Sequence, residues 1–100
     1  MTKEKLKQFI DLKQEIKEIE KRIKKEENIC LIHKLEERKS MITLLEIEIM
    51  EYINTISDSR IRRIMQYKYI EGYTWKKIAS IMHYDRSYPE KIITKYLNNS

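Results

Sequence analysis

The sequence predicts an all-α protein, in which an N-terminal helical hairpin or coiled coil (residues 1–56) precedes a three-helix helix-turn-helix domain (residues 57–100). Three observations predict this class. The 100 residues include one glycine and one proline, which leaves little material for the turns of β-hairpins. Charged residues make up 37% of the chain and hydrophobic residues 41%. The hydrophobic residues recur every three or four positions, as they do on amphipathic helices.

The first half of the chain carries two apolar stripes. The first comprises Phe9, Leu12, Ile16, Ile19 and Ile23, and the second comprises Leu31, Leu35, Ile42, Leu45, Ile49, Tyr52 and Ile56, with Arg38 interrupting it. The stripes are two residues out of phase, whereas a coiled coil absorbs insertions of three or four residues. We therefore expect antiparallel helices at about 3–26 and 30–56. A single bent helix that dimerises through both stripes is the alternative.

The turn between these helices is expected at Glu26, Glu27 and Asn28, which interrupt the apolar pattern. Asn28 is a fair helix terminator, because asparagine tolerates positive φ. Cys30 follows in an apolar cluster, and we expect it to be a small buried side chain.

The next helix is expected to begin at a cap on Ser57 or Asp58 and to stop near Gly72, the only glycine. Its inward side carries Ile61, Ile64, Met65 and Tyr69.

Residues 72–89, "GYTWKKIASIMHYDRSYP", hold the only glycine, tryptophan, alanine and proline of the chain. This run predicts a tight helix-turn-helix. Thr74 caps a helix over 75–82 that Trp75 anchors in the core, and the small Ala79 lets a second helix cross closely. His83 takes the position in the turn that needs positive φ, because histidine visits that region more often than most residues.

The final helix is expected to begin at Ser87, which forms a capping box with Glu90 and places Pro89 in the first turn. Its outward residues, together with Arg86, are the candidate contacts to bases in the major groove of DNA. These candidates are Arg86, Ser87, Tyr88, Lys91, Thr94 and Lys95. The candidate phosphate contacts are Arg62, Arg63, Lys76 and Lys77. The net charge of +5 supports an anionic partner, since residues 51–100 carry nine basic and five acidic residues.

The segment "YKYIEGYTWKKIASIMHYD" resembles the signature of small phage regulators related to the ArpU and RinA groups of late-gene transcription activators. Their C-terminal domains are similar to the DNA-binding region four of sigma factors. The matching positions are Lys68, Tyr69, Ile70, Gly72, Thr74, Trp75, Ile78, Ala79, Tyr84 and Asp85. The resemblance implies a DNA-binding helix-turn-helix, and it implies that the recognition helix begins at Asp85. The sequence departs from the family pattern at three positions: Lys68, where the family has arginine, Asp85, where it has serine, and Pro89, where it has an aliphatic residue.

Other classes of function find little support in the sequence. The single glycine excludes a phosphate-cradling loop, and no nucleophile stands with a base, so we expect no enzyme activity. Cys30, His33 and His83 lack the spacing of a zinc site, so we expect no metal and no cofactor. With no 18-residue apolar stretch and no signal peptide, we expect no membrane contact and a cytoplasmic location.

The sequence thus predicts a phage or prophage transcription regulator that binds double-stranded DNA and forms a homo-oligomer, in the simplest case a dimer, through residues 1–56. One alternative is a protein-interaction module that docks on RNA polymerase or another host protein. The other is a small packaging-related DNA-binding subunit.

Overall fold

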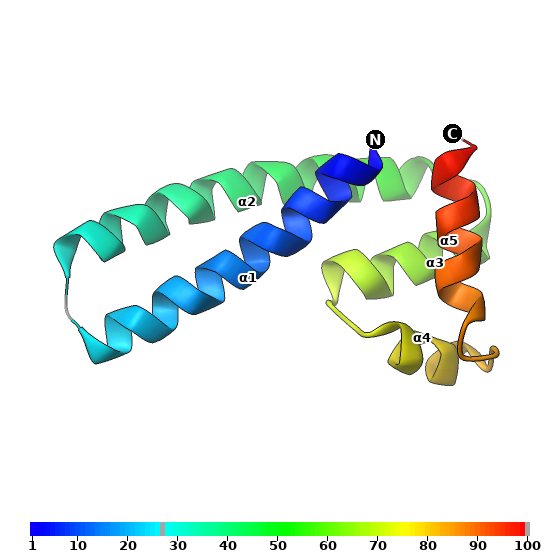
Figure 1. Ribbon diagram of the computed structural model, residues 1–100. Coiled ribbons are helices and arrows are strands. Elements are labelled where there is room, and N and C mark those ends of the chain that lie inside the picture. Colours follow the sequence, from blue (N-terminus) through cyan, green and yellow to red (C-terminus); the bar gives the residue numbers. More distant parts are fainter. Residues whose placement is uncertain (27, 100) are drawn as a thin grey trace.

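The computed structural model describes residues 1–26 and 28–99, and the elements in this part of the chain are all helical. They are α1 (Lys3–Lys25), α2 (Ile29–Thr55), α3 (Ser59–Met65), the π-helix η1 (Gln66–Ile70), α4 (Trp75–Met82) and α5 (Tyr88–Asn98). Helices α1 and α2 run antiparallel as a long hairpin, and the other helices gather near the end of the hairpin that is remote from its turn (Figure 1). The predicted all-α class is confirmed, and the hairpin forms in place of the alternative single bent helix.

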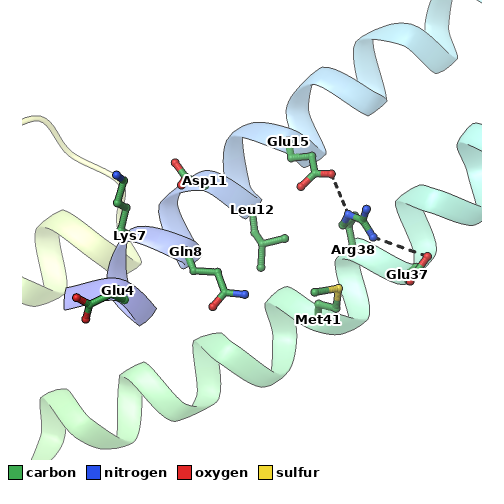
Figure 2. Close-up of a pocket in the computed structure, with 9 residues that line it drawn as sticks. All are labelled: Glu4, Lys7, Gln8, Asp11, Leu12, Glu15, Glu37, Arg38 and Met41. Atoms are coloured by element: carbon green, nitrogen blue, oxygen red, sulfur yellow. Dashed lines mark hydrogen bonds and ion pairs between the residues drawn. The ribbon is translucent and has the colours of Figure 1, made fainter. Parts of the chain in front are cut away.

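The two predicted apolar stripes form the contact between α1 and α2. In α1 the buried side chains are Leu6, Phe9, Leu12, Ile16 and Ile19, and in α2 they are Leu31, Ile49 and Ile53. Arg38, which interrupts the second stripe, lies at the edge of this contact. Figure 2 shows its guanidinium reaching across to α1, where Nε lies 2.8 Å from Glu15 Oε1. The interruption is therefore an ion pair between the helices.

The turn of the hairpin differs from the prediction in two respects. Asn28 does not end the first helix with positive φ; it has φ −130° and caps the start of α2, because its Oδ1 accepts a hydrogen bond of 2.9 Å from the Cys30 amide. Cys30 itself is exposed rather than buried. It lies in the first turn of α2, about 100° around the helix from Leu31, and Leu31 takes the direction toward the core. Glu27 lies outside the described residues.

Asp58, rather than Ser57, caps α3, since its Oδ1 accepts a hydrogen bond of 2.9 Å from the Arg60 amide. The α-helix does not continue to Gly72 as expected. It widens after Met65 into η1, where the Glu71 amide donates to the Gln66 carbonyl at 3.0 Å, five residues back. Gly72 then ends the helix with φ 75°, so its expected role at the helix end is confirmed.

Lys13 of α1 supports the end of η1. Its Nζ donates to the Tyr69 carbonyl at 2.7 Å and to the Ile70 carbonyl at 3.2 Å. These carbonyls have lost the usual i+4 partner, so the lysine supplies hydrogen bonds that the helix does not. Lys13 is partly buried, and this burial is the main cause of the lowered pKa of its ammonium group.

One core cluster joins the hairpin to the C-terminal helices. It includes Leu6 and Phe9 of α1, residues 49 and 53 of α2, and side chains from every later helix. The expected boundary between residues 56 and 57 therefore falls inside a shared core, where Ile56 itself is 2% exposed. Within the described residues, no helix is both long enough and apolar enough to cross a membrane.

Candidate nucleic-acid interface

Helix α4 is the first helix of the helix-turn-helix. Thr74 caps it as predicted, because its Oγ1 accepts a hydrogen bond of 3.2 Å from the Lys77 amide. Ile78 and Ala79 face the core and are buried. Trp75 is half-buried against the same core, with Lys68 Nζ 4.7 Å from its ring centroid, so it anchors the start of the helix. A side chain that is partly covered in this way serves packing first.

The turn after α4 depends on His83, which has φ 59° and ψ 40° in the left-handed region. The His83 amide donates to the Ser80 carbonyl at 3.4 Å, and the Tyr84 amide donates to the Ala79 carbonyl at 2.9 Å. These two bonds form a Schellman motif, which normally has glycine at the left-handed position. The predicted role of His83 is therefore confirmed.

Helix α5 begins at Tyr88, one residue after Ser87, with Pro89 in its first turn. The start that follows from local chemistry is confirmed, and the start at Asp85 that the family resemblance implies is wrong. Asp85 instead accepts from the Tyr88 amide through its carbonyl, at 3.0 Å, in the preceding turn. The expected capping box is also wrong, since Ser87 makes no side-chain capping hydrogen bond. Its backbone has φ −92° and ψ −8°, whereas a capping serine is normally extended.

The outward face of α5 is polar and basic. Pro89 and Ile93 are buried on the inward side. The exposed side chains of the opposite face, which we call the α5 face, are Ser87, Lys91, Thr94, Lys95 and Asn98. Ser87, Lys91, Thr94 and Asn98 follow one another at the three- and four-residue spacing that keeps side chains on one side of a helix, and Lys95 lies beside Thr94. Ammonium and hydroxyl groups arranged in this way can donate hydrogen bonds to phosphates and to acceptors on base edges.

Tyr88 differs from the other candidates on α5, because it is half-buried and packs edge-on against Tyr84. Their ring centroids lie 4.9 Å apart and the ring planes meet at 74°. The two tyrosines line a shallow cleft with His83, Asp85, Ser87 and Lys91 at the start of α5. Arg86 is exposed in the turn beside this cleft, and its amide donates to Asp85 Oδ1 at 3.0 Å. Tyr88 therefore forms part of the wall of the cleft.

The four predicted phosphate contacts come from two helices, Arg62 and Arg63 from α3 and Lys76 and Lys77 from α4. Lys76 and Lys77 are exposed near the start of α4, with Lys77 Nζ 4.0 Å from the Tyr73 ring centroid. Arg62 is partly buried, and its Nη1 donates to the Ile56 carbonyl at 2.7 Å, so it closes the C-terminal end of α2. Arg62 and Arg63 line a separate cleft with Asn54 and Tyr67. That cleft shares no lining residue with the one at the start of α5.

Arg60 is a cation that the sequence reasoning did not select. Its hydrogen bond to Asp58 is the main cause of the raised pKa of its guanidinium, and Tyr88 and Tyr84 lie close enough to raise the pKa further. The start of α3 therefore lies beside the tyrosine pair of the helix-turn-helix. Local sequence gives no signal for this, because the neighbours are about 25 residues apart along the chain and meet through the packing of α3 on α5.

The groove between α1 and α2 in Figure 2 has a different character. Its lining mixes the carboxylates of Glu4, Asp11, Glu15 and Glu37 with Lys7 and Arg38. Four carboxylates make it a poor site for a polyanion. No group of three or more His, Cys, Asp or Glu side chains is placed to hold a metal ion in the described part of the chain.

Comparisons of this chain with protein-family models, with curated proteins and with solved structures found no match. The site must therefore be interpreted from its own residues and geometry.

Proposed function

We propose that the protein is a transcription regulator, of phage or prophage origin and acting in the cytoplasm, that binds duplex DNA through α4 and α5. The observation that carries the proposal is the tight turn at His83. Because of this turn α5 crosses α4, and the α5 face stays exposed. A helix that is exposed along one polar, basic side and held from behind by buried Pro89 and Ile93 fits the major groove. The resemblance to the ArpU and RinA groups points to the same function.

The proposed roles follow from position. Lys91, Thr94 and Lys95 contact base edges or the phosphates at the rim of the groove. Arg86 and Ser87 lie just before the N-terminal end of α5 and contact the DNA there. Lys76 and Lys77 at the start of α4 contact phosphates, as does the exposed Arg63. Arg60 is a further candidate because it lies at the start of α3, which packs on α5. Phosphate contacts supply affinity and salt dependence, while base contacts supply sequence preference.

The test is selection of bound duplexes from a randomised DNA pool at near-physiological salt. Recovery of a sequence motif is the expected result, and two spaced copies of it would indicate a dimer. The variant Lys91→Glu/Lys95→Glu should lose at least about tenfold in affinity for the selected duplex. Lys21→Glu/Lys25→Glu is a matched control, because it makes the same charge change at the same spacing on exposed positions of α1. Equal losses in both variants would mean that binding reflects net charge alone.

A second candidate function is docking on RNA polymerase or another host protein. The observation that favours it is Ile81 of α4, an apolar side chain that is 37% exposed within the helix-turn-helix. If the protein docks on the polymerase, Ile81→Ser should weaken its binding in a pull-down with purified polymerase. Lys91→Glu/Lys95→Glu should leave this binding intact. The DNA-binding function predicts neither result. The packaging-related alternative predicts bulk, salt-sensitive binding with no recovered motif.

A further inference from the structure

Helix α2 exposes apolar side chains on the side that faces away from the core. Ile29 is 72% exposed, Ile47 50%, Met50 42% and Ile32 38%. Ile29 and Ile47 are 18 residues apart, which is five full helical turns, so their side chains point in the same direction. Ile32 and Met50 are also 18 residues apart, and their shared direction lies about 60° around the helix from that of Ile29 and Ile47. A soluble chain seldom leaves such a set uncovered on one helix without a partner for it.

The polar residues between them complete a symmetric pattern. We call the set the α2 stripe, and its members are Ile29, Ile32, Glu36, Thr43, Ile47 and Met50, all of them exposed. The gaps between successive members are three, four, seven, four and three residues. The spacing of the stripe is therefore symmetric about a midpoint between Lys39 and Ser40. The four apolar residues lie toward its two ends, and the two polar residues lie near its middle.

We propose that the α2 stripe is the surface through which two copies of this chain pair, with their α2 helices antiparallel about a two-fold axis at that midpoint. The axis places Ile29 opposite Met50 of the second copy and Ile32 opposite Ile47 of the second copy. Each apolar residue of the stripe then meets an apolar residue, as an isologous interface requires.

The symmetry of the α2 stripe selects a second copy as the partner, and the position of Glu36 selects the antiparallel direction. In this pairing Glu36 lies opposite Thr43 of the second copy, and Lys39 of that copy lies one helical turn from Glu36. A parallel pairing would instead place Glu36 against Glu36, which is repulsive. In the antiparallel pairing Lys39 lies one residue from Lys39 of the second copy, and a Glu36 lies one helical turn from each of them. The antiparallel stripe spans about 32 Å of helix, at 1.5 Å per residue.

The proposed function gives this pairing a use, although the pairing itself does not require DNA. The last residue of α2 lies about 16 residues from the axis, so the ends of the two α2 helices are roughly 50 Å apart. Each end leads into one helix-turn-helix, and the dimer therefore carries one DNA-binding module at each end of a helical rod. Two modules on one rod bind two half-sites with an effective concentration that a single module lacks.

Sedimentation equilibrium of the full chain without DNA tests the pairing, and its result is separate from any result on DNA binding. We expect a dimer at 10–100 μM or so, the range of a modest helix–helix contact. Ile47→Glu should raise the dissociation constant at least about tenfold. The matched control is Ile10→Glu, at an apolar side chain of α1 that is 39% exposed and lies off the stripe, and it should change the constant less than about threefold. Circular dichroism should show unchanged helix content for both variants, because both positions are exposed.

Cross-linking fixes the register. In a Cys30→Ser background, Ser40→Cys should form a disulfide-linked dimer on mild oxidation, because position 40 lies next to the axis. Glu51→Cys, about 17 Å from the axis along the helix, should not. A wild-type chain that stays monomeric at 100 μM, the upper end of that range, would overturn the proposal. The exposed face would then bind a different protein. An equal effect of Ile10→Glu would overturn the assignment of the contact to the α2 stripe. A cross-link at position 51 in place of 40 would overturn this register.

Discussion

Phe9 tests whether the hairpin and the helix-turn-helix fold as one unit. Its side chain is 0% exposed, in a core cluster that also contains residues of α3, α4 and α5, although Phe9 belongs to α1. Removing a buried phenylalanine ring destabilises a core by about 3–5 kcal/mol. Phe9→Ala also removes the ring that lies 4.6 Å from Lys13 Nζ, worth about 0.5 kcal/mol more. A chain of this size is stable by about 5–15 kcal/mol, so the variant should lose a large part of its stability.

Thermal unfolding followed at two probes measures this effect. Circular dichroism reports mainly on the long hairpin, and fluorescence of Trp75, the only tryptophan, reports on the helix-turn-helix. Phe9→Ala should lower both midpoints together by roughly 15–40 °C, since each kcal/mol is worth about 4–8 °C in a small domain. The neighbouring Ile10→Ala, at a side chain that is 39% exposed, is the control and should change either midpoint by a few degrees at most, of the order of surface substitutions. If the Trp75 transition stays in place while the helical signal shifts, the shared core is not cooperative and the reasoning fails.

Three further predictions concern the local devices of the fold. Thr74→Ala should lower the free energy of unfolding in urea by about 1 kcal/mol, because the cap of α4 is lost. Thr74→Ser should keep most of that stability, and equal losses in the two variants would contradict a capping role. His83→Gly should be no less stable than wild type, whereas the β-branched His83→Val should lose about 1 kcal/mol or more, and tolerance of valine would argue against the left-handed turn. The pKa of Asp58 is lowered, chiefly by its hydrogen bond from Arg60, so the carboxylate stabilises the fold fully above its ordinary pKa of 3.8. That contribution should fall as the pH drops through the lower folded pKa, and an acid titration of stability should show the loss in wild type but not in Asp58→Asn.

Much of the local structure could be predicted from the chain because its signals act over a few residues. The caps at Thr74 and Asp58, the left-handed His83 and Gly72, and the proline in the first turn of α5 each follow from the chemistry of one turn. The prediction of a capping box at Ser87 was wrong, because the bent backbone before α5 turns the serine away from the extended conformation that capping needs.

The features that escaped prediction depend on residues far apart in the sequence. The α-helix after Asp58 widens into η1, and Lys13, more than 50 residues earlier, supplies the hydrogen bonds that its end requires. Arg62 fits a phosphate contact by residue type, yet packing turns it to the Ile56 carbonyl. Arg60, which local patterns did not single out, comes to lie beside Tyr84 and Tyr88.

The sequence by itself determined the helical class, the two apolar stripes, the hairpin's two-residue change of phase and the helix-turn-helix, because periodicity and turn chemistry are local properties. Only the tertiary structure decided which cations share a surface, that the core spans both segments, and that α2 has a second apolar side. The physical reason is that an apolar stripe specifies that a helix must be covered, whereas the packing of the whole chain decides which side is covered and which remains for a partner.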